Sequence, residues 1–280
     1  MLRRMREAGL RTRKALGQHF LLDPALLAAL VRDAAVAPDD VVLEVGAGLG
    51  AFTRALALVA RRVVAVELDE RLLALAREFS AGHERIAFVQ ADALAEGRGL
   101  SAALREALGS DAADYRIVAN LPYRIATALL LGLFEDERHP PRSAHVMVQA
   151  EVARRICARP GGKDYGALTV RLGRCAHARV LRAVGRAAFV PPPRVDSAFL
   201  ELIGRPPDPA REKIPVFVEL VNRVFSQRRK TLGAALRGLE PQRREALNTF
   251  LRERGFPENV RGERLAGDDF LALAKLLDTP

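Results

Sequence analysis

Four consecutive residues near the middle of the chain, Asn120-Leu121-Pro122-Tyr123, have side chains suited to holding a flat heterocycle. They directly follow an apolar run, residues 115–119. The Asn amide and a main-chain carbonyl can accept hydrogen bonds from an exocyclic amine, and the Tyr ring can stack on the same heterocycle. Asn and Pro also punctuate ordinary loops, so by itself the tetrapeptide more often marks a turn. Its interpretation as a pocket for a base depends on other segments.

A glycine-rich segment, Glu44-Val45-Gly46-Ala47-Gly48-Leu49-Gly50, is placed where a strand ends and a helix begins. Glycines there allow a tight turn and a close approach of the backbone to a ligand, which points to Gly46 and Gly48 as binding residues. The spacing departs from the G-x-G-x-x-G of dinucleotide-binding folds. Glu44 would also repel a pyrophosphate. The segment therefore favours a ligand that carries an ammonium group, such as S-adenosylmethionine.

Two further acids follow the next two predicted strands. Glu67 closes the second strand, where a carboxylate can accept hydrogen bonds from both ribose hydroxyls. Asp92 follows the third strand and can accept from an adenine amine. Each has an ordinary explanation, Glu67 as a solvated strand end and Asp92 as a helix N-cap. Together with Glu44 they occupy successive strand ends, the edge at which open α/β sheets bind ligands, and so predict a methyl-donor site.

The elements that position these residues alternate between short β-branched runs and longer amphipathic ones, which predicts an α/β domain with a parallel sheet and helices on both faces. The predicted strands are 41–45, 63–67, 86–90, 116–119 and 145–149, and the predicted helices lie near 51–60, 70–79, 100–108 and 125–134. Residues 179–184 and 197–203 predict an antiparallel pair at one edge. The proline-rich stretch 205–209 then predicts a linker. Helical periods at 216–225, 230–236, 243–254 and 268–277 follow it, so we expect one domain over 1–205 and a small all-helical domain over 206–280.

The chain is basic, with a formal charge of +10 and a pI near 10.5, which favours a polyanionic partner. Basic residues gather in three clusters: Arg3, Arg4, Arg6, Arg11, Arg13 and Lys14; Arg154, Arg155, Arg159 and Lys163; Arg223, Arg228, Arg229 and Lys230. A solvated, arginine-rich surface of the kind that a GC-rich genome produces is the alternative explanation.

The two cysteines, Cys157 and Cys175, have neither metal spacing nor a disulfide framework, which favours a reduced cytosolic compartment without a metal. We expect no membrane span, because no apolar run approaches about 20 residues.

Five segments together resemble one family, the ribosomal RNA adenine N6-dimethyltransferases of the small subunit. They are Lys14–Leu21 (KALGQHFL), Glu44–Gly50, Asn120–Tyr123, Ala188–Ser197 (AFVPPPRVDS) and Phe225–Thr231 (FSQRRKT). The resemblance covers nearly the whole chain in the family's order and spacing. It implies a Rossmann-like class I methyltransferase sheet followed by a helical domain that binds RNA. It also implies transfer of methyl groups from S-adenosylmethionine to N6 of two adjacent adenines in a 3′-terminal hairpin of 16S ribosomal RNA, giving N6,N6-dimethyladenosine during 30S biogenesis. Ribosomal RNA is then the partner, and we expect a cytoplasmic monomer.

The resemblance also implies roles for single residues. His19, Leu21, Gly46, Glu67, Asp92 and Asn120 are expected to contact S-adenosylmethionine. Asn120, Leu121 and Tyr123 are expected to hold the target adenine, with the Leu121 or Pro122 carbonyl as second acceptor for its amine. Phe189 is expected to close over the opposite face of the base. A core position is the alternative for Phe189, but the three prolines beside it favour a stiff, exposed loop.

The chain departs from the family at two places. Bacterial relatives usually carry Asn at the position of His19, and archaeal or eukaryotic relatives more often carry His followed by Ile, whereas here Phe20 follows. A hydrogen-bonding side chain is kept, so we expect activity to be retained. The segment Arg124-Ile125-Ala126-Thr127 replaces a common Asn-Ile-Ser-Thr, with little expected effect.

Three other functions share parts of this pattern. An antibiotic-resistance methyltransferase of large-subunit ribosomal RNA has the same cofactor motifs, but the segments 188–197 and 225–231 favour the small-subunit enzyme. A non-catalytic assembly or transcription factor of the same fold is disfavoured by the intact Asn120–Tyr123 and the three acids. A DNA adenine methyltransferase usually has Pro-Pro after its Asp or Asn, unlike Leu-Pro here.

Overall fold

The computed structural model describes residues 1–10, 18–93, 99–136, 138–206 and 215–278. Contacts divide the chain into two compact units, Met1–Ala153 with Ala176–Gly204 and Arg154–Cys175 with Arg205–Pro280. This division corrects the expected boundary between 1–205 and 206–280 in one respect, because residues 154–175 belong to the second unit. The physical reason is burial: Tyr165 and Val170 lie in the same apolar core as Phe217 and Phe270.

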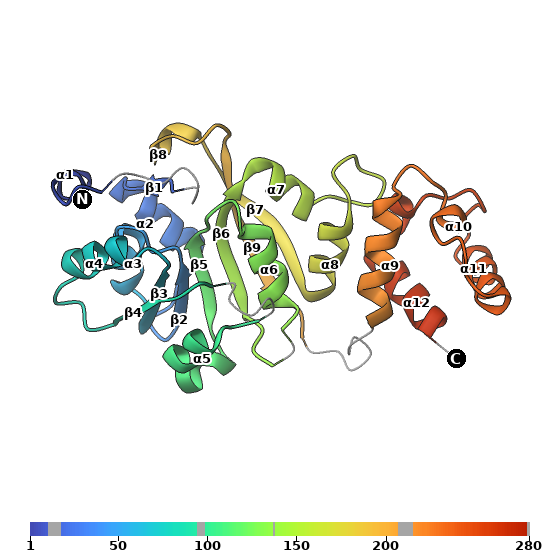
Figure 1. Ribbon diagram of the computed structural model, residues 1–280, viewed down its shortest axis with the longest axis horizontal. Helices are drawn as coiled ribbons and strands as arrows, with labels where there is room; N and C mark the ends of the chain where they lie inside the picture. Colours follow the sequence, from blue (N-terminus) through green and yellow to red (C-terminus); the bar gives the residue numbers. More distant parts are fainter. Residues whose placement is uncertain (11–17, 94–98, 137, 207–214, 279–280) are drawn as a thin grey trace. The chain divides into compact units, whose positions relative to one another are not determined.

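A seven-stranded sheet forms the centre of the first unit (Figure 1). Its strand order is β4 (Ile86–Gln90), β3 (Arg62–Glu67), β2 (Val41–Val45), β5 (Arg116–Asn120), β6 (Ser143–Gln149), β9 (Ser197–Gly204) and β7 (Ala176–Val184). The first five strands are parallel, and β9 and β7 are antiparallel to their neighbours. The predicted parallel sheet and the predicted antiparallel pair at its edge are both confirmed.

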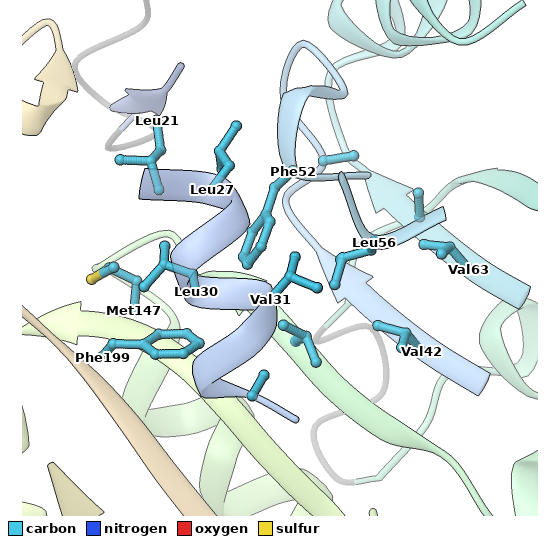
Figure 2. Close-up of a cluster of buried hydrophobic side chains, with 14 of the residues drawn as sticks. Leu21, Leu27, Leu30, Val31, Val42, Phe52, Leu56, Val63, Met147 and Phe199 are labelled. Atoms are coloured by element: carbon cyan, nitrogen blue, oxygen red, sulfur yellow. The ribbon is translucent and has the colours of Figure 1, made fainter. Parts of the chain in front are cut away.

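Helices connect the parallel strands, as the alternating pattern predicted. They are α3 (Ala51–Ala57), α4 (Glu70–Phe79), α5 (Ala102–Leu108) and α6 (Ala126–Phe134). Helix α2 (Pro24–Asp33), which was not predicted, precedes β2, and short 3₁₀ turns lie at η2 (Gly109–Ala113) and η3 (Arg186–Ala188). Figure 2 shows Leu30 of α2 beside Met147 and Phe199, and Val31 of α2 and Leu56 of α3 on the side of the strand residues Val42 and Val63. Every residue of β2 is buried, so both faces of this strand are covered.

A second, two-stranded sheet pairs residues that are far apart in the sequence. Strand β1 (Phe20–Leu21) lies antiparallel to β8 (Phe189–Val190), with Leu21 opposite Phe189. This pairing brings the segment before the first helix of the sheet domain against the proline-rich segment that precedes β9. Both segments carry motifs that the sequence analysis singled out.

The described part of the basic N-terminal cluster is a helix packed on the first unit. In α1 (Leu2–Glu7) and the three residues that follow it, Met5 and Leu10 are buried against Leu72 and Leu75 of α4. Arg4 of the same helix donates to Glu78 at 2.8 Å. Helix α1 is therefore docked on α4, while Arg11, Arg13 and Lys14 lie outside the described residues.

The second unit is helical. Its helices are α8 (Ala167–Cys175), α9 (Pro215–Ser226), α10 (Leu232–Ala235), α11 (Pro241–Glu253) and α12 (Gly267–Asp278), with the 3₁₀ turn η5 (Gly262–Arg264), while α7 (Ala150–Ile156) carries the chain from one unit to the other. The hydroxyl of Tyr165 donates to the Leu265 carbonyl at 2.8 Å, and the Phe225 ring meets its ring edge-on. The four helices predicted after residue 215 are all present.

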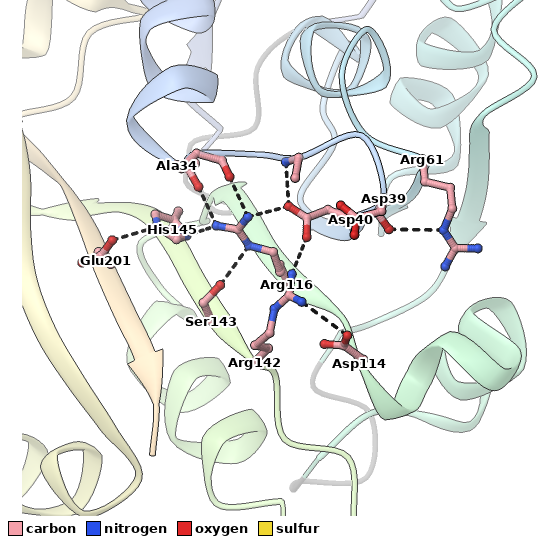
Figure 3. A network of polar contacts seen from close by, with 12 residues as sticks. Ala34, Asp39, Asp40, Arg61, Asp114, Arg116, Arg142, Ser143, His145 and Glu201 are labelled. Atoms are coloured by element: carbon pink, nitrogen blue, oxygen red, sulfur yellow. Dashed lines mark hydrogen bonds and ion pairs between the residues drawn. The ribbon is translucent and has the colours of Figure 1, made fainter. Parts of the chain in front are cut away.

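A buried polar network lies at the edge of the sheet where β5 and β6 begin (Figure 3). Arg116 donates to a carboxylate oxygen of Asp40, to the Ala35 carbonyl at 2.9 Å and to the Ser143 hydroxyl at 3.0 Å. Burial acts to raise the pKa of Asp40, but the Ala37 amide and the Arg116 guanidinium outweigh it and hold that pKa below its ordinary value. The network ties the start of the sheet together and leaves the opposite edge for a ligand.

His145 belongs to the same network and is buried between Arg116 and Glu201. Burial lowers the pKa of its imidazole to about 4, and the positive charge of Arg116 acts in the same direction. The ring is therefore neutral at physiological pH.

None of the helices in the described ranges has both the length and the apolar character needed to cross a membrane.

Candidate functional site

The carboxyl ends of β2, β3, β4 and β5 meet at one edge of the sheet and surround a cavity of about 240 Å³. Residues 18–22 form another part of its lining. Ten of the eleven predicted site residues line this one cavity: His19, Leu21, Gly46, Gly48, Glu67, Asp92, Asn120, Leu121, Pro122 and Tyr123. The predicted cofactor residues and the predicted base-binding residues are thus brought together, although they come from segments about 100 residues apart in sequence.

The glycine segment after β2 is shaped by two close approaches. Gly46 has φ +82°, and a Cβ there would lie 3.1 Å from the ring of Pro122. Gly48 has φ +57°, and a Cβ there would lie 3.1 Å from the ring of Phe20. Both conformations are in the left-handed region that favours glycine, so the sequence needs glycine for backbone and space alike.

Glu44 is buried in the wall of the cavity. Its side-chain oxygen Oε2 is without a hydrogen-bond partner among the described residues, and so is the neighbouring hydroxyl of Thr53. Burial raises the pKa of Glu44 to about 8; the nearby Thr53 hydroxyl acts to lower this pKa, and the charge of Glu67 acts to raise it. A buried carboxyl oxygen without a donor is costly, and a cationic ligand in the cavity would satisfy it.

Glu67 is held at the end of β3 by backbone amides. Its Oε2 accepts from the Gly48 amide at 2.9 Å and its Oε1 accepts from the Asp69 amide at 3.0 Å. Burial raises the pKa of Glu67, and these amides oppose the shift. A carboxylate has about four acceptor positions, so acceptor capacity remains for ligand hydroxyls beside these amides.

Asp92 lies beyond the end of β4 and is exposed at the cavity. The lining of the same cavity includes Leu68, which sequence reasoning missed. Leu68 is 52% exposed and also lines the cavity. An apolar side chain directly after a strand-end acid was the available signal, because such a residue has no core to enter and offers a flat apolar surface to a ligand.

Asn120 ends β5 with its amide group oriented by the backbone of residue 19. Its Nδ2 donates to the His19 carbonyl at 2.9 Å, which leaves Oδ1 as the accepting end of the side chain. The His19 ring stacks on the Tyr123 ring, with centroids 5.7 Å apart and an interplanar angle of 27°. The His19 Nδ1 donates to the Pro191 carbonyl at 2.7 Å. His19, predicted as a cofactor contact, thus also contacts Asn120 and Tyr123, two of the residues predicted to hold the base.

Phe189 is placed differently from the expectation. Its side chain is 1% exposed, packs in the core of the first unit and does not line the cavity. The prediction of an exposed loop at this residue is wrong, because pairing of β8 with β1 turns the ring inward opposite Leu21. Successive side chains of a strand point to opposite faces, and the neighbouring Val190 is accordingly exposed.

No cluster of three or more His, Cys, Asp or Glu side chains suited to a metal ion occurs within the described ranges.

Comparison with known proteins places the chain among ribosomal RNA methyltransferases. The family model described as ribosomal RNA adenine dimethylase matches residues 9–278. A protein of Thermobifida fusca named ribosomal RNA small subunit methyltransferase A is 40% identical over 276 residues, covering 96% of this chain and 91% of its own. A protein of the same name from Geobacillus kaustophilus is 37% identical over 273 residues, covering 96% and 92%.

Solved structures agree. A dimethyladenosine transferase from Plasmodium falciparum superposes with a TM-score of 0.74 at 25% identity, covering 91% of this chain and 96% of its own. The 23S rRNA methyltransferase ErmE superposes with a TM-score of 0.67 at 28% identity, covering 93% and 100%. With its methyltransferase sheet, its cavity at the carboxyl edge and a family match over almost its whole length, the chain belongs to the ribosomal RNA adenine dimethylase family.

Proposed function

We propose that the protein transfers methyl groups from S-adenosylmethionine to N6 of two adjacent adenines in the 3′-terminal hairpin of 16S ribosomal RNA, acting as a cytoplasmic monomer during 30S biogenesis. The observation that carries the proposal is the presence of a cradle for a cationic donor and an amine-accepting Asn120 in a single cavity. The names of the curated relatives favour the small subunit over the large one.

The residues of the cavity fit S-adenosylmethionine. Glu44, a buried carboxyl with an unsatisfied oxygen, would accept from the ammonium of the methionine portion. Glu67 would accept from the ribose hydroxyls and Asp92 from the adenine amine. The close approaches at Gly46 and Gly48 would let the backbone reach the ligand. When bound, S-adenosylmethionine supplies a methyl group activated by its sulfonium.

The target amine would be held by two acceptors. Asn120 Oδ1 is one, because Nδ2 is committed to His19. Of the two carbonyls considered from the sequence, that of Pro122 already accepts from the Ile125 and Ala126 amides, at 3.0 and 3.2 Å. We therefore assign the second acceptor to Leu121. Tyr123 would stack on the ring of the base, which must leave its own stack to enter.

Positioning dominates the chemistry that these residues can perform. The adenine amine is a poor nucleophile because its lone pair is delocalised into the ring. Accepting both of its hydrogens favours a pyramidal nitrogen whose lone pair points at the methyl group, and alignment of this kind can supply much of the rate. No general base is required, because the nitrogen becomes acidic once it is methylated and releases its proton to solvent.

The basic surface proposed to hold RNA phosphates is smaller than the sequence indicated. Arg223 donates to the Ala235 and Arg237 carbonyls, and Arg228 donates to Glu263 at 2.8 Å and to the Gly162 carbonyl at 3.0 Å. These two arginines tie the second unit together. Of the two basic clusters predicted in this unit, Arg154, Arg155, Arg159, Lys163, Arg229 and Lys230 are exposed. Arg154 lies 4.0 Å from the Asp164 carboxylate, and we assign phosphate contacts to the other five.

The first test is a transfer assay with labelled S-adenosylmethionine on 30S subunits that lack dimethyladenosine, with 50S subunits as the control. We expect N6,N6-dimethyladenosine in small-subunit RNA alone, identified by mass analysis of the labelled nucleoside. Label in 50S subunits would indicate the large-subunit activity instead. The variant Asn120→Ala should retain RNA binding and lose nearly all transfer, and an active variant would remove the amine-positioning argument.

The second test concerns the phosphate contacts. Replacing Arg229 and Lys230 by Ala should weaken RNA binding and reduce the slope of log K against log salt by about 2, one for each lost contact. The matched control replaces Arg243 and Arg244, an equally exposed pair on α11, and should leave the slope unchanged. Equal slopes for the two double variants would show that Arg229 and Lys230 are a solvated surface.

A further inference from the structure

The hydroxyl of Tyr123 is bound by a residue that has no part in the cavity lining. Tyr123 Oη and Ser197 Oγ lie 2.6 Å apart, and Ser197 is 1% exposed. Tyr123 follows β5 and Ser197 begins β9, so the bond passes over β6, which lies between these strands. Only the antiparallel direction of β9 brings its first residue to the edge of the sheet at which β5 ends.

The same tyrosine ring is supported on its face by His19. His19 in turn is bound through Nδ1 to the Pro191 carbonyl at 2.7 Å. Pro191 and Ser197 both belong to the segment 189–197, whose Phe189 is in the core. This segment therefore contacts the site through two groups. The Pro191 carbonyl fixes the His19 ring, and the Ser197 hydroxyl fixes the Tyr123 ring.

We propose that Ser197 is a positioning residue for methyl transfer, which anchors the Tyr123 hydroxyl and so sets the plane in which the tyrosine ring meets the target base. The proposal rests on the proposed function. A tyrosine side chain rotates about two bonds, and a buried hydroxyl partner at the far end of the ring removes that freedom. An anchored ring is already oriented for stacking on the adenine, so binding of the base does not cost the conformational entropy of ordering the tyrosine side chain.

Two single substitutions remove this hydrogen bond from opposite sides. Ser197→Ala and Tyr123→Phe should each lower kcat for transfer to 30S subunits about fivefold, the usual effect of one such bond. The affinity for S-adenosylmethionine should stay unchanged in Ser197→Ala, because Ser197 does not line the cavity. The double variant should be no slower than either single variant, since both remove the same interaction.

The chain offers a spectroscopic readout that does not depend on activity. It contains three tyrosines, Tyr115, Tyr123 and Tyr165, and no tryptophan. With ring-labelled tyrosine the NMR spectrum has one set of signals for each, and Tyr123→Phe identifies the set of Tyr123. Ser197→Ala should move the Tyr123 signals and leave the other two in place. Ser143→Ala is the control, because Ser143 is another buried, hydrogen-bonded serine at the opposite end of the β6–β9 pair.

Each outcome decides between the proposal and its failure. A non-additive loss together with a shift confined to Tyr123 supports it. Losses that multiply to about 25-fold in the double variant, or unmoved Tyr123 signals, overturn it. If Ser197→Ala does not fold, Tyr123→Phe still removes the bond at a half-buried position, and full activity of that variant also overturns the proposal. A wild-type protein without transfer activity overturns the proposed function instead, a result that the NMR arm cannot produce.

Discussion

Binding of S-adenosylmethionine should depend on pH through Glu44. With a pKa near 8 this carboxyl is about nine-tenths protonated at pH 7 in the ligand-free protein. An ammonium group needs the carboxylate form, so binding must displace the proton. At pH 7 this costs about 1.4 kcal/mol, or about tenfold in affinity, and at pH 6 about twice that free energy. The Kd should therefore fall close to tenfold between pH 6 and pH 7 and approach a plateau near pH 8.

Isothermal titration calorimetry measures both the affinity for S-adenosylmethionine and the release of the Glu44 proton. Titrations from pH 6.0 to 7.5, in buffers of different ionisation enthalpy, give the affinity and the number of protons released, which should be about 0.9 per ligand at pH 7. The range ends at pH 7.5 because the ligand's own amino group has an ordinary pKa of about 7.7–8.0. The variant Glu44→Gln should bind with an affinity independent of pH. Glu201→Gln, at the opposite edge of the sheet, should keep the wild-type profile.

Two results would refute this reasoning. An affinity that is constant from pH 6 to 7.5 in the wild-type protein would show that Glu44 does not receive the ammonium, or that its carboxyl is already ionised. A pH-dependent affinity that persists in Glu44→Gln would place the titrating group elsewhere in the cavity.

Three further variants test the architecture around the site. Gly48→Ala should weaken S-adenosylmethionine binding about fivefold to 30-fold by calorimetry, because the left-handed backbone costs about 1–2 kcal/mol and the new Cβ presses on the Phe20 ring. Gly262→Ala should lower the thermal midpoint of unfolding, since its Cβ would collide with Val224 Cγ1 and overpacking costs about 1–3 kcal/mol. The folded pKa of His145 is lowered to about 4, so between pH 6.5 and 4 the unfolded chain binds a proton that the folded chain does not. Urea unfolding should therefore show the wild-type protein losing about 3 kcal/mol more than His145→Gln over that range as pH falls, and parallel profiles would place the ring in a wetter environment.

The sheet and the cavity were predictable because they follow from local pattern and one topological rule. Runs such as 41–45 are apolar at every position except Glu44, which is typical of strands that are covered on both faces. Once parallel strands alternate with helices, their carboxyl ends must share an edge, so Glu44, Glu67, Asp92 and Asn120 were expected to meet before any coordinates were known.

The sequence did not show which apolar core a helix joins, or which groups a charged side chain binds. Nothing local shows that residues 154–175 pack with helices that begin after 215, because an amphipathic helix such as α8 fits any apolar surface of the right shape. The cluster around Arg228 poses the same difficulty. Its sequence does not distinguish a solvated arginine from one bound to carbonyl groups of distant turns, and the structure assigns Arg223 and Arg228 to the second kind.

The segment 188–197 is the clearest case in which the composition of a loop did not predict the orientation of its side chains. Prolines make a backbone stiff, but they do not decide which way the neighbouring side chains point; strand pairing does, and the pairing of β8 with β1 sends Phe189 inward and Val190 outward. The contacts that do reach the site come from the Pro191 carbonyl and the Ser197 hydroxyl. A carbonyl is present at every residue and serine is a common one, so neither carries a signal in a single sequence. Their significance comes from β9 running antiparallel to β6, which is a property of the whole sheet.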